Sequence, residues 1–123
     1  RVLDKDFGLI PLVVGDARPD QVEAVIERLW DGPETLVLIS SDLSHYQDYD
    51  TARRLDSVTS RAIEQLNPAA IDYQQACGRT PVNGLLLAAR HHQLHARTLD
   101  QRSSGDTAGG RDRVVGYGAY AFC

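Results

Sequence analysis

Residues 7–41 read FGLIPLVVGDARPDQVEAVIERLWDGPETLVLISS, and the expected architecture follows from this stretch. Its first part, residues 7–14, is a continuous apolar run, which is typical of a strand buried on both faces. Residues 19–30 begin with a proline and carry apolar side chains at helical spacing. Residues 34–41 form a second continuous apolar run. Strand, helix and strand within about 35 residues predict a βαβ unit, in which the strands are parallel.

The rest of the chain continues the mixture of helices and strands. We expect helices over residues 51–66, from Asn67-Pro68 toward Ala76, and from Thr80-Pro81 onward, with Asp50 as the N-cap of the first. We expect strands near residues 94–99 and over VVGYGAYAF at 114–122, where glycines alternate with larger side chains. The predicted class is α/β with a mostly parallel or mixed sheet.

Composition limits the kinds of partner. The 123 residues, with 42% hydrophobic and 24% charged side chains, suit one globular domain over residues 1–123. A net charge of −4 provides no basic field for nucleic acid, and no apolar run approaches the roughly 20 residues that cross a bilayer. Two cysteines are too few for a disulfide framework. We therefore expect a cytoplasmic protein without a nucleic-acid or membrane partner.

Polar side chains follow the second apolar run, at the end of a predicted strand where α/β proteins bind ligands. Asp42 and His45 lie three residues apart there, so the carboxylate can orient the imidazole for acid/base chemistry. We assign both as candidate catalytic residues. The alternative is that Asp42 only forms a turn with its own backbone while His45 lies on the surface.

A second candidate is Cys77, which precedes a predicted helix start. The free amides and dipole of a helix N-terminus favour the thiolate, which is the form that attacks electrophiles and binds metals. The alternative is a small buried apolar side chain beside a helix cap. Arg79 can hold an anion at the same place, and we assign Arg79, Tyr46 and Asp106 to substrate binding.

Two further patterns do not support a site. His91, His92 and His95 lack the glutamate of the HExxH zinc motif, since His92 occupies its place. The glycine-rich loop at residues 103–112 lacks the lysine and the strand–loop–helix context of a phosphate loop. Neither metal binding by these histidines nor nucleotide binding is expected.

Several blocks of sequence together resemble the Memo family, the Memo part of the AmmeMemoRadiSam proteins. These blocks are LIPLVVG at 9–15, LISSDLSHY at 38–46, ACGRTPVNGLLLA at 76–88, SSGD at 103–106 and VVGYGAYAF at 114–122. The family is similar in fold to the class III extradiol (LigB-like) dioxygenases. The resemblance implies a three-layer αβα fold and a pocket lined by Asp42, His45 and Cys77, with His45 as acid/base and Cys77 as metal ligand.

The resemblance also implies that this chain is the C-terminal half of a longer protein. Family members are about twice as long, and their two metal-binding histidines lie upstream of the position of Arg1. The implied cofactor is a mononuclear iron or copper whose site is incomplete here, because such iron typically has three protein ligands. The implied function is a redox or dioxygenase-type role on a small molecule. The alternatives are a peptide or phosphopeptide binding module, or an inactive fragment. The expected partner is an N-terminal half or a second copy.

Overall fold

A computed structural model describes residues 6–123 as three α-helices, two short 3₁₀ helices and three strands. The α-helices are α1 (Pro19–Leu29), α2 (Tyr49–Glu64) and α3 (Arg79–His91). The 3₁₀ helices are η1 (Pro68–Ala70) and η2 (Ser104–Asp106). The strands are β1 (His45–Gln47), β2 (Ala96–Ser103) and β3 (Val114–Phe122). None of these helices is long and apolar enough to span a membrane.

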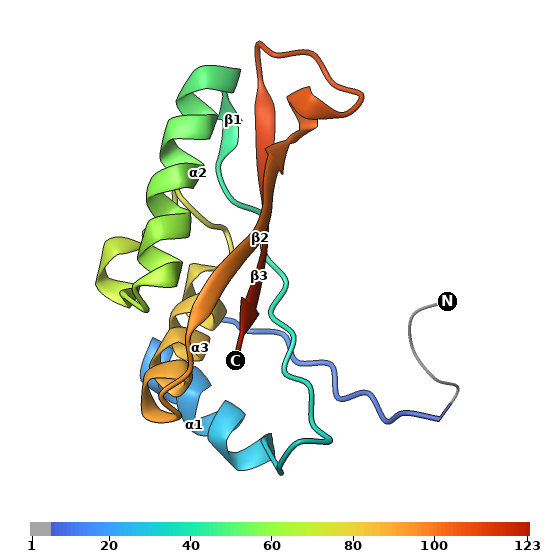
Figure 1. Cartoon of the computed structure of the whole chain (residues 1–123), viewed down its shortest axis with the longest axis vertical. Helices are drawn as coiled ribbons and strands as arrows, with labels where there is room; N and C mark the ends of the chain where they lie inside the picture. The colour runs from blue at the N-terminus through green and yellow to red at the C-terminus, as the bar shows by residue number, and fades with distance from the viewer. Residues whose placement is uncertain (1–5) are drawn as a thin grey trace.

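The strands form one sheet in the order β1-β3-β2, with both pairs antiparallel. Strands β2 and β3 make a long ribbon that runs through most of the height of the molecule in Figure 1. Their pairing extends from Ala96 opposite Phe122 to Ser103 opposite Gly116, with one irregularity between Thr98 and Asp100. The short β1 joins the far end of β3.

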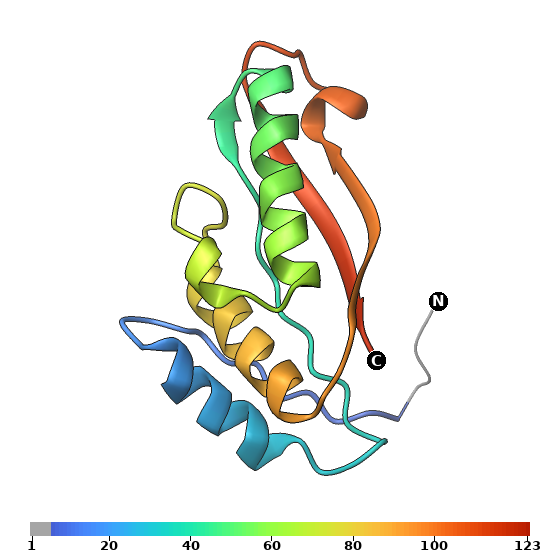
Figure 2. The same ribbon diagram turned by 60° about the vertical axis from the view of Figure 1, so that its left-hand side comes forward.

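The helices cover this ribbon along its length. Figure 2 shows α2 lying along β2 and β3, and α1 and α3 side by side below it. Helix α3 contributes to both hydrophobic clusters of the core. One cluster comprises Ala62, Ile63, Ile71, Ala76 and Leu86, and the other comprises Val22, Ile26, Leu85 and Ala88. Phe122, at the end of β3, packs against both.

The mixed α/β class is confirmed, and so are the strand at 114–122 and, with a shift of a few residues, the strand near 94–99. The helix predicted at 51–66 begins two residues early, because Asp48 rather than Asp50 caps it and accepts from the Thr51 amide at 3.0 Å. The helix predicted from Asn67-Pro68 to Ala76 is wrong. Only the single turn of η1 forms there.

The two apolar runs at 7–14 and 34–41 are not strands, so the predicted parallel βαβ pairing is wrong. They run without regular secondary structure along one side of the molecule (Figure 1). Val37 and Ile39 pack against the α1–α3 cluster, whereas Leu36 and Leu38 are 81% and 83% exposed. This alternation between buried and exposed side chains is typical of an extended backbone. A strand also needs a neighbour for its amides and carbonyls, and the described residues do not provide one here.

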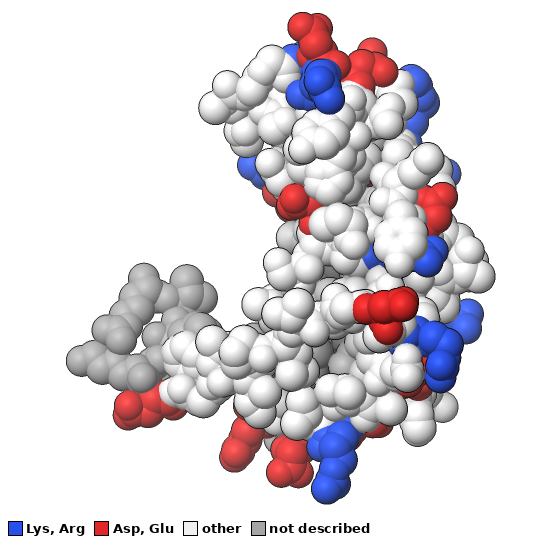
Figure 3. Space-filling model, turned by 180° about the vertical axis from the view of Figure 1, so that it is seen from behind, with Lys and Arg blue, Asp and Glu red and all other residues white. Residues whose placement is uncertain are grey.

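Much apolar side-chain surface remains exposed along these runs. The large apolar residues of the first run are exposed: Phe7, Leu9, Ile10, Leu12 and Val13. Figure 3 shows a broad uncharged surface on this part of the molecule, with charged side chains toward its margins. Contiguous apolar surface of this kind is typical of an interface.

We expect the 123-residue chain on its own to self-associate through residues 34–41. Burying a leucine side chain stabilises an interface by about 1.5–3 kcal/mol, so substituting Leu36 and Leu38 by Glu should shift the equilibrium toward monomer. Sedimentation velocity over a range of concentrations measures the change. Val58→Glu is the matched control, since Val58 is half exposed on α2, away from both runs. Wild-type chain that stays monomeric at every concentration contradicts the prediction.

Candidate functional site

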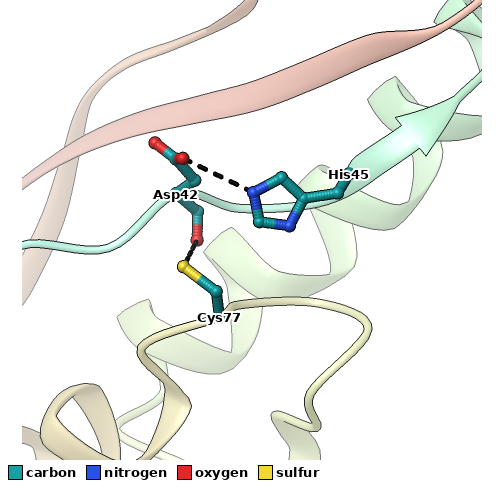
Figure 4. A group of neighbouring side chains, drawn as sticks. All are labelled: Asp42, His45 and Cys77. Carbon is teal, nitrogen blue, oxygen red and sulfur yellow. Dashed lines mark hydrogen bonds and ion pairs between the residues drawn. The ribbon is translucent and has the colours of Figure 1, made fainter. Parts of the chain in front are cut away.

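Asp42 and His45 lie on the segment that leads from the second apolar run into β1. The carboxylate Oδ2 of Asp42 lies 3.4 Å from Nε2 of His45 (Figure 4). Both side chains reach solvent, at 50% and 31% exposure. This is a long hydrogen bond, so the carboxylate orients the ring without burying it. The structure thus brings together the pair that the sequence predicted.

Cys77 reaches the same place from the turn before α3. Its thiol Sγ lies 3.9 Å from the backbone carbonyl oxygen of Asp42 (Figure 4) and 3.8 Å from the Ser41 hydroxyl. Ser41 fixes this approach, because its hydroxyl accepts a 2.9 Å hydrogen bond from the Gly78 amide and donates to the Asp42 carbonyl at 2.7 Å. Gly78 is the N-cap of α3 and Arg79 is its first residue, so Cys77 lies two residues before the helix.

Asp42, His45 and Cys77 form a compact group of potential metal ligands. One atom from each, a carboxylate oxygen, an imidazole nitrogen and the thiol sulfur, lies within 4.8 Å of the other two. Within residues 6–123 no other three His, Cys, Asp or Glu side chains are grouped in this way. His92, for example, contacts Glu27 of α1 at 2.9 Å and joins α3 to α1.

Tyr46 directly follows His45 in the chain, and Arg79 comes two residues after Cys77. Tyr46 follows His45 with its backbone in the left-handed region, at φ 62°, and its ring is 67% exposed. The Arg79 guanidinium lies over the Tyr73 ring, 3.6 Å from the centroid, so a cation–π contact holds it there. Their assignment to substrate binding stays a prediction.

Asp106 is occupied by structural bonds. Its carboxylate accepts from the Tyr49 hydroxyl at 2.5 Å and from the Ser103 amide at 2.8 Å, which caps η2. The Tyr49 hydrogen bond, followed by the Ser103 bond, lowers the pKa of Asp106. Its assignment to substrate binding stays a prediction, because these hydrogen bonds do not test it.

Sequence reasoning missed two polar residues beside the group. Ser41 holds the turn at Cys77, as described above. Asp56, on α2, is 2% exposed and accepts from the Ser44 amide at 3.0 Å. Burial raises the pKa of Asp56, although the Ser44 bond and the charge of His45 oppose that rise. A charged residue on the apolar side of a predicted helix was the available signal.

Comparison with known proteins agrees with the motifs. The family model for Memo-like protein matches residues 1–121 of this chain. The chain belongs to the Memo-like family. The resemblance drawn from the sequence is confirmed at the level of the family.

Two similar curated proteins are MEMO1 family proteins. The chain is 31% identical over 125 residues to a MEMO1 family protein of Aeropyrum pernix, which covers 93% of this chain and 44% of that protein. It is 29% identical over 129 residues to a MEMO1 family protein of Metallosphaera sedula, covering 95% and 46%. The chain thus spans about half the length of the curated relatives it matches.

Gly78→Ala should destabilise the protein and disturb the site. A Cβ at Gly78 would lie 2.8 Å from the Ser41 Cβ and 3.2 Å from the Ser40 carbonyl oxygen, so the two segments must separate. We expect a loss of about 1–3 kcal/mol in the free energy of unfolding, measured by urea denaturation, because overpacking costs that much. Cys77 should also react faster with a thiol reagent.

Gly110→Ala is the matched control, because nothing lies within 4 Å of a Cβ there. It should change the free energy of unfolding by less than about 0.5 kcal/mol, as exposed substitutions do. Equal effects of the two substitutions would contradict the close approach of Ser41 to Gly78.

Asp106→Asn should destabilise the fold at neutral pH but not in strong acid. A carboxyl whose pKa is lowered in the folded state stabilises that state above its unfolded pKa, and the stabilisation is lost as the pH falls through the folded value. Urea denaturation of the variant at pH 7 should therefore show a lower free energy of unfolding than wild type, and the difference should vanish in strong acid, below the folded pKa of Asp106. A difference that is the same at both pH values would contradict this account.

Proposed function

We propose that this Memo-like chain contributes to a mononuclear transition-metal centre with a redox or dioxygenase-type role. Cys77 is the metal ligand, and the Asp42–His45 pair is the acid/base group beside it. The observation that supports the proposal is the grouping of the three potential ligand atoms within 4.8 Å of one another.

The donor set fits iron or copper. A metal bound to the Cys77 sulfur at about 2.3 Å would lie close to the Asp42–His45 pair, because the three potential ligand atoms lie within 4.8 Å of one another. A thiolate ligand suits iron, copper and zinc, and does not suit magnesium or calcium. When bound, such a metal would supply a Lewis acid and, as iron or copper, a one-electron redox centre.

The chain's own residues then have separate tasks. Asp42 orients His45 through the 3.4 Å contact, and imidazole is the side chain best suited to exchange protons near neutral pH. Ser41 keeps the Cys77 thiol against the same backbone turn. The group is partly open to solvent, which leaves access for a small molecule or a peptide.

Further ligands belong, in this proposal, to residues outside this chain. The chain spans about half the length of its relatives, and the apolar runs at 7–14 and 34–41 expose surface that an N-terminal half or a second copy would cover. The proposal includes a reducing compartment such as the cytoplasm, because Cys77 must stay a free thiol, as both cysteines are here.

The alternative is a binding module for a peptide or phosphopeptide that performs no turnover. The contact that supports it is the stacking of Arg79 on Tyr73, two residues from Cys77, since a fixed guanidinium suits a phosphate or carboxylate. In that case binding depends on Arg79 and needs no metal.

Anaerobic titration of the 123-residue chain with ferrous and cuprous ions tests the proposal. We expect weak binding that depends on Cys77 and His45. Cys77→Ser and His45→Ala should each lower the metal affinity at least 10- to 100-fold, roughly the effect of losing a residue that supports a metal ligand. Cys123→Ser and His91→Ala are the matched controls, because both residues are exposed and lie outside the group.

Equal binding by wild type and Cys77→Ser would contradict the metal proposal. Metal-free binding of a phosphopeptide that Arg79→Ala abolishes and Cys77→Ser leaves intact would favour the alternative instead.

A further inference from the structure

The proposed acid/base histidine lies next to a buried carboxylate that its chemistry does not use. Asp56 is on α2, is 2% exposed, and is among the most completely buried side chains of the described residues. One carboxylate oxygen, Oδ1, accepts the Ser44 amide at 3.0 Å. Ser44 is itself 0% exposed and immediately precedes His45.

The backbone before His45 is held from two sides. On one side β3 pairs with it, since the Leu43 amide donates to the Gly116 carbonyl at 2.9 Å and the Gly116 amide donates to the Ser44 carbonyl at 2.8 Å. The Ser44 amide takes no part in this pairing. It donates instead to the carboxylate of Asp56, which lies on α2. This bond completes the hydrogen bonding at a buried position, where an unpaired amide is costly.

Gly116 and Asp56 fit each other sterically. A Cβ at Gly116 would overlap the Asp56 carboxylate, so only glycine lets β3 pass this close to the side chain. The glycine thus serves two contacts at once, the pairing with residues 43–44 and the space for Asp56.

The segment needs this anchoring because the backbone turns sharply just after it. Tyr46 has φ 62°, and the pairing of β1 with β3 is irregular between His45 and Gln47. A non-glycine residue in the left-handed region is disfavoured unless its surroundings fix it. Asp56 and Gly116 fix the residues before the turn.

We propose that Asp56 is a positioning residue, which fixes the Ser44 amide and thereby directs the His45 imidazole toward Asp42 and Cys77. The geometric claim stands on the hydrogen bonds above. Its relevance to a metal centre rests on the proposed function.

Two NMR measurements on the metal-free chain test the geometric claim. Asp56→Ala should speed hydrogen exchange of the Ser44 amide by about tenfold or more, and should remove the through-space contact between the His45 ring and the Cys77 β-protons. Asp56→Asn keeps an oxygen acceptor and should preserve both signals, which a general loss of stability would not explain.

Ser60→Ala is the matched control. Ser60 is buried on the same helix, one turn away, and its hydroxyl bonds to Gln101 and Tyr120 instead of the site. It should leave the Ser44 exchange rate and the His45–Cys77 contact unchanged. If Asp56→Ala does not fold, Gly116→Ala decides, because it displaces the carboxylate without deleting it and should also remove the contact.

An intact His45–Cys77 contact in folded Asp56→Ala, or in Gly116→Ala if Asp56→Ala does not fold, would overturn the proposal. So would its loss in Asp56→Asn or in Ser60→Ala.

Cobalt(II) affinity, read from the thiolate-to-cobalt absorption, links the residue to the proposed centre. We expect about 10- to 100-fold weaker binding in Asp56→Ala and near wild-type binding in Asp56→Asn. Wild-type chain that binds no cobalt would count against the proposed function, and the NMR measurements would still decide the role of Asp56. Cobalt bound equally by wild type and Asp56→Ala would overturn that role.

Discussion

The pairing of Gly116 with Leu43 and Ser44 is the contact on which the arrangement of this chain depends. It joins the middle of the sequence to the last strand, more than seventy residues later, through two backbone hydrogen bonds of 2.8 and 2.9 Å. Without a side chain at Gly116, β3 can lie against both residues 43–44 and the Asp56 carboxylate of α2. Three elements therefore meet at one glycine, and the candidate site residues Asp42 and His45 directly flank residues 43–44.

The fold was predictable where local sequence alone determines structure. Helix α1 begins at Pro19 and follows its apolar spacing, and β3 follows the alternation around Gly116 and Gly118. The strands predicted at 7–14 and 34–41 do not form, because an apolar β-type sequence favours an extended backbone but does not specify a strand to pair with. The partners for these runs are missing from the described residues, so Leu36 and Leu38 remain exposed. The helix after Pro68 failed for a local reason, since the Asp72 carboxylate accepts hydrogen bonds from the Gln74 and Gln75 amides and forms a separate turn.

The site was predictable as a set of residue types, and its support was not. Asp42, His45 and Cys77 were identified from spacing, position and family resemblance, and the structure brings their side chains together. Ser41 accepts a hydrogen bond from a backbone amide 37 residues away, and Asp56 accepts one from an amide 12 residues away. No local sequence pattern indicates such contacts. The hydrogen bonds of Asp106 were equally hidden, because Tyr49 is 57 residues away, and its assignment to substrate binding stays a prediction.

The exposed apolar run at residues 34–41 continues along the chain directly into the candidate site, so contacts made by the run affect the position of the site. Residues 36–39 lead through Ser40 directly into Ser41 and Asp42. The position of the run therefore limits where the group of potential metal ligands can move. Val37 and Ile39 already anchor one side of the run against the α1–α3 cluster. A neighbour that covers Leu36 and Leu38 would anchor the other side of the run, a few residues along the chain from Asp42. In the proposed function, burial of this apolar surface and completion of the metal centre would be the same event, and the hydrophobic effect would supply the free energy that orders the site.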